Sequence, residues 1–196
     1  MSNRDIVIKF ASSHSSDISE HLLKIYDTII QKSPKTIVEL GVRTGMSTFA
    51  LSRAAQDTGA TLTSVDIKDC SKQCNWDKWK FVKMDDLEFA DILEGKIDIL
   101  FIDTNHAFGQ MVNELKKFFP KMNKKGIIII HDTNIQDPII KSRIEDRVGG
   151  DIRIGKAIDL IFNITGKWDT NFTIDTENAK IVNFANNNGM AFVFLK

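Results

Sequence analysis

The chain lacks several features that would place it in a specialised class of protein. Its 26 basic and 26 acidic residues cancel to a formal net charge of zero. Charge therefore gives no indication of nucleic acid or an anionic membrane as a partner. No apolar run approaches the roughly 20 residues of a membrane span, and the first residues lack the apolar core of a signal peptide. We expect a cytoplasmic protein that binds neither nucleic acid nor a membrane.

Cysteine is scarce too, with only Cys70 and Cys74 present. One isolated pair does not suffice for a disulfide framework or a zinc site. In a reducing compartment both residues stay free thiols. With 196 residues, the chain is long enough to bury the core of one domain without such cross-links.

A strand, a glycine-containing loop and a helix follow one another early in the chain. The run Thr36–Leu40 is β-branched and apolar, which favours a buried strand. Gly41 and Gly45 permit a tight turn and a close approach of the backbone to a ligand. Ser47 and Thr48 are placed to cap the following helix, whose first N–H groups are free. The order of these elements predicts a ligand-binding site at the start of a helix.

The carboxylate of Glu39 restricts the kind of ligand that suits this loop. It lies two residues before Gly41, where it would repel a pyrophosphate. A ligand that presents hydroxyl or ammonium groups fits better. The spacing Glu39-x-Gly41-x-x-x-Gly45 also differs from G-x-G-x-x-G, which argues against a nicotinamide dehydrogenase.

Predicted strands alternate with predicted helices along the chain. The strands are expected at 36–40, 61–66, 81–84, 97–103, 126–132, 172–175 and 190–195, and the helices at 17–32, 46–57, 87–94, 107–119 and from 154. This alternation predicts an open α/β sheet of seven strands. We expect one domain over 1–196, with a helical cap at 1–33 and a polar lid or substrate loop at 134–153.

Acidic residues lie at or just beyond the ends of the first five predicted strands. They are Glu39, Asp66, Asp85 with Asp86, Asp103 and Asp132. Ligands of open α/β sheets bind beyond the carboxyl ends of the strands. The sequence therefore predicts a row of carboxylates at the binding edge.

These motifs resemble those of class I S-adenosylmethionine-dependent methyltransferases of the small O-methyltransferase type. Glu39-x-Gly41-x-x-x-Gly45 is similar to the first motif of the family, and Asp66 stands where its ribose-binding acid is expected. Segments 101–106 and 126–132 resemble two later motifs of metal-linked O-methyltransferases. The resemblance covers about 34–133 and the two last strands, and implies a doubly wound, mostly parallel, Rossmann-like sheet with an antiparallel C-terminal strand.

The resemblance also implies how S-adenosylmethionine would be bound. The cofactor-binding residues would be Glu39, Gly41, Gly45, Ser47, Asp66, Asp85, Asp86 and Asp103. Asp66 would accept two hydrogen bonds from the ribose diol. Glu39 would help to hold the ammonium group, and Asp85 or Asp86 would receive the adenine amine.

Methyl transfer further requires an acceptor oxygen that is aligned with the sulfonium methyl and deprotonated. Asp103 and Asp132 would bind Mg²⁺, which lowers the pKa of a substrate hydroxyl. Alternatively, His106 would act as the general base, with Asp103 as the second catalytic residue. In related enzymes a third carboxylate or amide completes the metal site, whereas here His131 and Thr133 flank Asp132, with Asn134 one residue further on. His131 is expected to pack or to hydrogen-bond behind the site.

We therefore predict a methyltransferase that acts on a hydroxyl group of a small molecule. The alternatives are an N-methyltransferase or an aminopropyl transferase on the same scaffold, or a cofactor-binding module without catalysis. Specificity for the acceptor is expected in the N-terminal helix and at 134–153, whose sequences do not identify the acceptor. The apolar face of the N-terminal helix is also available to a second copy in a homo-oligomer.

Overall fold

The computed structural model describes residues 1–196, which divide into two units, Met1–Phe101 and Ile102–Lys196. Three parallel strands run through the first unit. The three strands are β1 (Thr36–Leu40), β2 (Thr61–Asp66) and β3 (Trp79–Lys83), in the order β3-β2-β1. Their register places Glu39 beside Ser64, and the N–H of Gly41 continues the ladder to the carbonyl of Val65. The carboxyl ends of β1 and β2 are thereby fixed next to one another.

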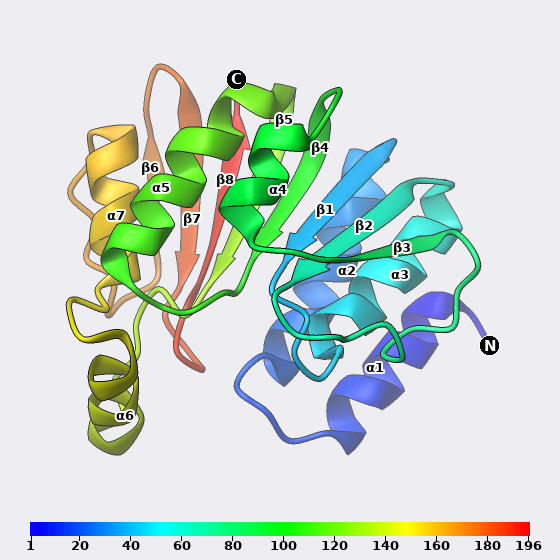
Figure 1. Cartoon of the computed structure of the whole chain (residues 1–196), viewed down its shortest axis with the longest axis horizontal. Helices are drawn as coiled ribbons and strands as arrows, with labels where there is room; N and C mark the ends of the chain where they lie inside the picture. The colour runs from blue at the N-terminus through cyan, green and yellow to red at the C-terminus, as the bar shows by residue number, and fades with distance from the viewer. The chain divides into compact units, whose positions relative to one another are not determined.

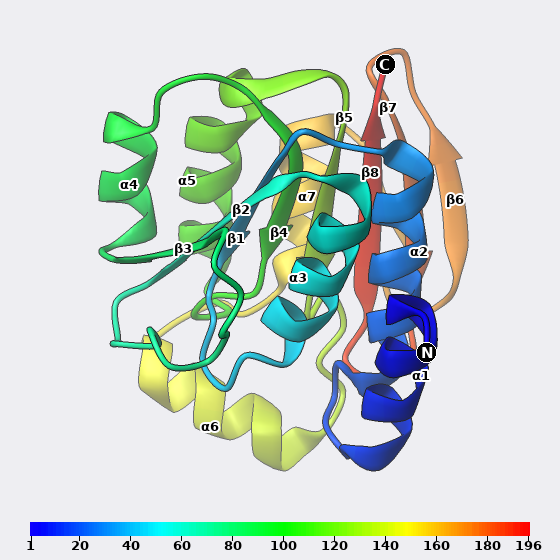
Figure 2. The ribbon, with the colours of Figure 1, turned by 90° about the vertical axis from the view of Figure 1, so that its right-hand side faces the viewer.

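The helices of the first unit cover both faces of these strands. They are α1 (Asn3–Ser13), the 3₁₀ turn η1 (Ser19–His21), α2 (Leu22–Lys32), α3 (Met46–Thr58) and α4 (Asp86–Ile92). Helices α1, α2 and α3 pack on one another, and α4 lies on the opposite face of the strands from α2 and α3 (Figure 2). The unit ends in β4 (Ile97–Ile102).

The N-terminal region differs from the single helix expected at 17–32. Helix α1 precedes it, and a capping box between Ser2 and Asp5 starts α1. Helix α2 begins only at Leu22, after the turn η1. The apolar residues that predicted one helix are nevertheless buried, since α2 buries Leu22, Ile25 and Ile29, and Ile18 is buried directly before η1.

Antiparallel strands form the sheet of the second unit. They are β5 (Met122–His131), β6 (Phe172–Asp175), β7 (Ala179–Phe184) and β8 (Met190–Leu195), in the order β5-β8-β7-β6. The unit also holds α5 (Phe108–Phe118), the turn η2 (Phe119–Lys121), α6 (Pro138–Val148) and α7 (Ile154–Phe162), and α5 packs against α7. Figure 1 shows α6 beyond the ends of the unit's strands.

The α/β class and the antiparallel C-terminal strand are confirmed, but the chain has eight strands instead of seven. The additional strand is β7, in which Asn183 lies buried on the same face as Ala179 and Ile181. Because Asn183 interrupts the apolar residues on the buried face, the alternation of apolar and polar residues that is typical of a strand was not recognised here. None of the helices combines the length and hydrophobicity that crossing a membrane requires.

The segment 134–153 contains a helix where a loop was expected. Asp137 caps α6 by accepting hydrogen bonds from the N–H groups of Ile139 and Ile140, Pro138 occupies its first turn, and Gly149 ends it in a left-handed conformation. These are strong helix boundary signals. Helix α6 buries none of its residues, so its role as a lid stays a prediction.

Replacing Gly189 with alanine should lower the free energy of unfolding by about 3 kcal/mol. Gly189 has a φ of +84°, and a Cβ there would lie 2.4 Å from Oγ1 of Thr133. The left-handed backbone costs a non-glycine residue about 1–2 kcal/mol, and relieving the clash about 1–3 kcal/mol more. Gly95, with a φ of +82° and no atom within 4 Å of its Cβ position, is the matched control. Urea unfolding of both alanine variants measures the difference, and equal losses would contradict the steric argument.

Candidate functional site

The carboxylate of Glu39 is completely buried and is held by hydroxyl groups. Ser47 donates to Oε1 at 2.6 Å, Thr48 to Oε2 at 2.8 Å, and Ser64 also donates to Oε2. Trp79 extends the network, because its Nε1–H donates to Oγ of Ser64 at 2.8 Å. Glu39 thus ties the start of α3 to β1 and β2, and its contact with a ligand ammonium group stays a prediction.

Ser47 does not cap helix α3, contrary to the expectation from the sequence. Gly45 occupies the N-cap position with a φ of +79°, and no side chain caps the helix. The hydroxyl of Ser47 is directed to Glu39 instead. A Cβ on Gly45 would lie 2.9 Å from Cβ of Gln73, so this position needs glycine for its conformation and for its close contact.

Asp66 is bound to the loop that follows β1. Its Oδ2 accepts hydrogen bonds from the N–H groups of Val42 at 2.9 Å and Arg43 at 3.0 Å, and its Oδ1 accepts from Lys68 at 2.8 Å. Burial opposes ionisation of Asp66, but these three N–H groups outweigh it and hold its pKa below the ordinary value. Asp66 is therefore a carboxylate positioned beside the loop that contains Gly41 and Gly45.

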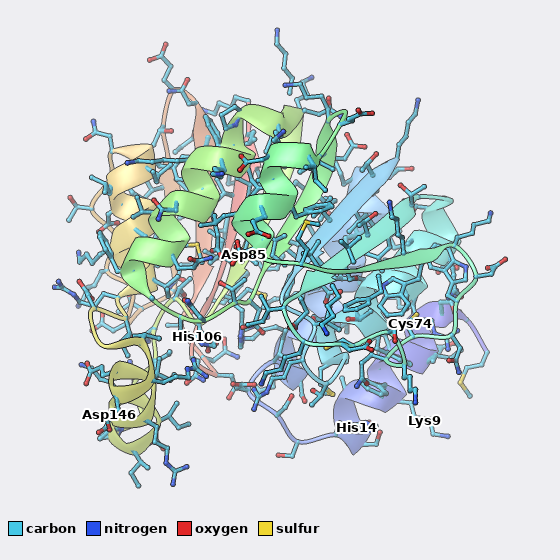
Figure 3. The ribbon with its side chains drawn as sticks, viewed as in Figure 1. Lys9, His14, Cys74, Asp85, His106 and Asp146 are labelled. Atoms are coloured by element: carbon cyan, nitrogen blue, oxygen red, sulfur yellow. The ribbon has the colours of Figure 1, made fainter.

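Asp85 and Asp86 stand at the start of α4. Asp85 is exposed and caps the helix, since its Oδ1 accepts from the N–H groups of Leu87 at 2.9 Å and Glu88 at 3.2 Å. Asp86 is the first residue of α4. Figure 3 shows Asp85 between β3 and α4. A role in binding adenine stays a prediction for both residues.

In the second unit, two aspartates and two histidines come together, and we call Asp103, His106, His131 and Asp132 the histidine–aspartate cluster. Nε2 of His106 lies 3.2 Å from Oδ1 of Asp103 and also contacts Oδ2 of Asp132. Nδ1 of His131 lies 3.3 Å from Oδ2 of Asp132 and 3.6 Å from Oδ2 of Asp103. His106 lies in the loop before α5 (Figure 3), and His131 is the last residue of β5.

The charges of the cluster shift the ionisation of all four of its members. Burial opposes the charged form of His106, but Asp103 and Asp132 outweigh it and raise the pKa of His106 to about 9. The same two carboxylates raise the pKa of His131 well above its ordinary value, again against burial. The histidines in turn lower the pKa of both carboxyl groups, against the effect of burial. Each carboxylate is thus ionised in the folded chain.

Helix α6 contributes one side chain to the edge of the cluster. Nη2 of Arg147 donates to the carbonyl of Asn105 at 3.0 Å and lies 3.2 Å from Nδ1 of His106. Because a guanidinium can only donate, this contact requires Nδ1 to accept and favours the neutral ring. Arg147 therefore acts on His106 in the direction opposite to the two carboxylates.

The backbone of the cluster is strained in two places. His106 has a φ of 65° and Asp132 a φ of 57°, a left-handed conformation that residues other than glycine seldom adopt. The loop before α5 is held by Glu114, whose buried carboxylate accepts from Thr104 at 2.6 Å and from Gln110 at 3.2 Å. Strain of this kind persists where surrounding contacts enforce it.

The structure thus gathers most of the expected residues into two groups. Glu39, Ser47 and Asp66 surround the loop that contains Gly41 and Gly45, and Asp103, His106 and Asp132 meet in the cluster. Asp103 does not cap α5; the N–H of Ala107 is bound by Asn105 instead. The sequence did not indicate the following residues: Ser64, Glu114 and Arg147. They contact residues on other elements, so the spacing of residues along a single helix or strand does not indicate these contacts.

Part of the chain is similar to a known protein family. Residues 38–133 match the model of a family described as a methyltransferase domain. An uncharacterised protein of Acanthamoeba polyphaga mimivirus is 31% identical over 85 residues, which is 41% of this chain and 37% of that protein. The match thus spans little more than a third of that relative.

Solved structures with the same fold include several methyltransferases. The SAH-bound methyltransferase PaMTH1 of Podospora anserina has a TM-score of 0.65 at 14% identity, covering 99% of this chain and 88% of that chain. An O-methyltransferase of Bacillus cereus in complex with SAH has a TM-score of 0.61 at 12% identity, covering 99% and 90%. The MycE methyltransferase of the mycinamycin pathway, in complex with Mg, SAH and mycinamycin VI, has a TM-score of 0.59 at 20% identity, covering 91% and 49%.

Proposed function

We propose that this chain, in which residues 38–133 match the model of a methyltransferase domain, is a class I S-adenosylmethionine-dependent methyltransferase that transfers a methyl group to a hydroxyl group of a small molecule. The observation that carries the choice of a hydroxyl is the histidine–aspartate cluster. A hydroxyl must lose its proton to become a strong nucleophile, whereas a neutral amine attacks without prior deprotonation. Two imidazoles held by carboxylates supply the bases that such an acceptor needs.

The first unit would bind the cofactor. The carboxylate of Asp66, kept ionised by backbone N–H groups, suits a ribose diol. Free N–H groups at the start of α3 suit the carboxylate of the methionine part, since no side chain caps this helix. Glu39, Asp85, Asp86 and Asp103 keep the cofactor-binding roles that the family resemblance gives them.

In its neutral form, His106 would accept the proton of the acceptor hydroxyl. Because Asp103 and Asp132 raise the pKa of His106 to about 9, this form predominates only at alkaline pH. As the oxygen attacks, a C–O bond forms to the methyl carbon and the C–S bond breaks, leaving S-adenosylhomocysteine and a methyl ether. The proton passes to the imidazole of His106, whose Nε2 faces Asp103 and Asp132. These carboxylates orient the ring and stabilise the imidazolium that results.

A divalent ion has a possible donor set in the same cluster. Asp103 and Asp132 supply the oxygen ligands that Mg²⁺ prefers, and Oδ1 of Asp132 is buried without a hydrogen-bond partner. A bound ion would lower the pKa of an acceptor hydroxyl. The third donor is the imidazole of His131, which is not the oxygen ligand that Mg²⁺ usually takes.

Calorimetry with S-adenosylmethionine, S-adenosylhomocysteine and NAD tests the cofactor. We expect both sulfur compounds to bind and NAD to bind more weakly than either; tighter binding of NAD would overturn the assignment. Release of S-adenosylhomocysteine is then measured with small acceptors that carry either a hydroxyl or an amine. Methylation confined to the amines would contradict the proposal, and binding without transfer to either class would favour a non-catalytic module.

A further inference from the structure

We propose that Arg147 of α6 is a further catalytic residue, which binds the acceptor oxygen while the acceptor gives its proton to Nδ1 of His106. The reaction itself rests on the proposed function, whereas the hydrogen bonds that this role requires do not. Both residues belong to the second unit. Figure 3 shows the loop of His106 next to α6, on which Asp146 precedes Arg147.

The contacts of His106 define which of its two ring nitrogens is basic. Nε2 lies 3.2 Å from Oδ1 of Asp103 and also contacts Asp132. An ionised carboxylate can only accept a hydrogen bond, so Nε2 carries a hydrogen. Nη2 of Arg147 lies 3.2 Å from Nδ1 and can only donate, so Nδ1 carries a lone pair. In the neutral ring, Nδ1 is therefore the nitrogen that accepts a proton.

The two sides of the imidazole differ in how a ligand can reach them. Nε2 faces the carboxylates, of which Asp132 is only 4% exposed. Nδ1 faces Arg147, and both Arg147 and the neighbouring Asn105 are exposed. An acceptor must reach the nitrogen that carries the lone pair, so it approaches between His106 and α6. Its hydroxyl then takes the place of Nη2 at Nδ1.

Arg147 keeps an anchor when it releases Nδ1 of His106. Its Nη2 also donates to the carbonyl of Asn105 at 3.0 Å, and this bond does not involve the imidazole. The segment after α6 is tied to the same loop, since the N–H of Phe108 donates to the carbonyl of Asp151 at 2.7 Å. The guanidinium therefore stays beside the acceptor oxygen after the hydroxyl has replaced it at Nδ1.

A guanidinium in this place stabilises the oxygen as it loses its proton. The proton passes to Nδ1, and the ring becomes an imidazolium whose Nε2–H remains on the carboxylates. The oxygen keeps the electron pair of the O–H bond and forms the bond to the methyl carbon, while the electron pair of the C–S bond goes to sulfur. A charged donor directed at this oxygen stabilises the negative charge that develops on it. The remaining N–H groups of Arg147 are suited to this, because the guanidinium has five donors.

Nitrogen nuclear magnetic resonance of the full-length protein with isotope-labelled histidine tests these hydrogen bonds without any methyl transfer. Long-range proton–nitrogen spectra show which ring nitrogen carries the hydrogen, and the signals of His106 are those that His106→Gln removes. In alkaline solution, where the neutral ring predominates, we expect the hydrogen on Nε2. A neutral His106 with its hydrogen on Nδ1 would overturn the inference.

Arg147→Ala identifies the partner of Nδ1 in the same spectra. It should shift the Nδ1 signal of His106, because the hydrogen bond is lost, and leave the hydrogen on Nε2, which the carboxylates still hold. Arg143→Ala is the matched control, since Arg143 is an exposed arginine one turn earlier on the same helix. It should leave the signal in place. A signal that responds equally to both substitutions, or to neither, would contradict the assigned contact.

The catalytic role of Arg147 is measured with a hydroxyl acceptor that the release of S-adenosylhomocysteine has identified. Arg147→Ala should lower kcat about 100-fold, the lower end of what one donor to a developing oxyanion contributes. Arg147→Lys keeps a positively charged donor and should be faster than both Arg147→Ala and Arg147→Gln, which lack the charge. The affinity for S-adenosylhomocysteine should be the same in all three variants. A folded Arg147→Ala protein with wild-type kcat would refute the role.

The two kinds of measurement separate this inference from the proposed function. A protein that methylates a hydroxyl, with a kcat that Arg147→Ala leaves unaltered, would refute the role of Arg147 alone. A protein that shows the expected nitrogen signals, but releases no S-adenosylhomocysteine with any hydroxyl acceptor, would refute the proposed function and the catalytic use of Arg147 with it. The hydrogen bond from Arg147 to Nδ1 of His106 would still stand.

Discussion

The variant Asp66→Ala is expected to bind S-adenosylmethionine about 100- to 20,000-fold more weakly than the wild-type protein. Two charge-assisted hydrogen bonds to the ribose diol would be lost, each worth about 1.5–3 kcal/mol, and every 1.4 kcal/mol or so is tenfold in affinity. The substitution also removes the acceptor for the N–H groups of Val42 and Arg43. Calorimetric titration with S-adenosylmethionine and with S-adenosylhomocysteine measures the loss.

Asp77→Ala is the matched control, because Asp77 is an exposed aspartate in the segment between β2 and β3. It should leave the dissociation constant of the cofactor unchanged. Thermal unfolding of both variants shows whether Asp66→Ala still folds. A folded Asp66→Ala protein that binds S-adenosylmethionine within about threefold of wild type would refute the role of Asp66, since one charged hydrogen bond alone exceeds that factor.

The second large effect is expected for His106→Ala, which should lower kcat about 100- to 10,000-fold, the range that general acid–base groups contribute. The buried imidazole contacts both carboxylates of the cluster, so its removal takes away the proposed proton acceptor. S-adenosylhomocysteine should still bind, because His106 is not among the residues that are expected to bind the cofactor. Single-turnover kinetics measures the effect, with an acceptor that the S-adenosylhomocysteine release assay has identified.

His14→Ala is the control for the loss of a histidine, because His14 is exposed and lies outside the cluster, and it should leave kcat unchanged. His106→Gln keeps a polar side chain of similar length without a basic nitrogen, and it should be as slow as His106→Ala. A variant at position 106 that retained wild-type kcat while folded would show that another group takes the proton.

Some features of the site could be predicted because the signals lie next to one another in the sequence. Gly41, Gly45 and Asp66 follow directly from a strand, a loop and a second strand with an acid at its end. The structure places the carboxylate of Asp66 against the loop between Gly41 and Gly45. Asp103 and Asp132 were likewise visible as acids at strand ends, and they do meet in the cluster.

Other features of the site could not be predicted, because they depend on how elements that are far apart in the sequence pair with one another. Ser64 reaches Glu39 because β1 and β2 are in parallel register, and no spacing in the sequence gives that register. His131 was expected to pack or to hydrogen-bond behind the site, but the alternation of β5 does not show which groups face its last residue. The structure places its Nδ1 3.3 Å from Asp132. Location in the cytoplasm and a homo-oligomer stay predictions.

The direction of β8 has a practical consequence for handling this protein. Met190 pairs with His131, and β8 then runs antiparallel to β5, so that Phe194 pairs with Ile127. At about 3.3 Å per residue, the five steps from Met190 to Leu195 carry the end of the chain about 17 Å from the cluster. A fluorophore or an immobilisation tether on Lys196 would therefore leave the cluster accessible. An oligohistidine tag there should be cleaved before metal titration, since it would compete for the same ions.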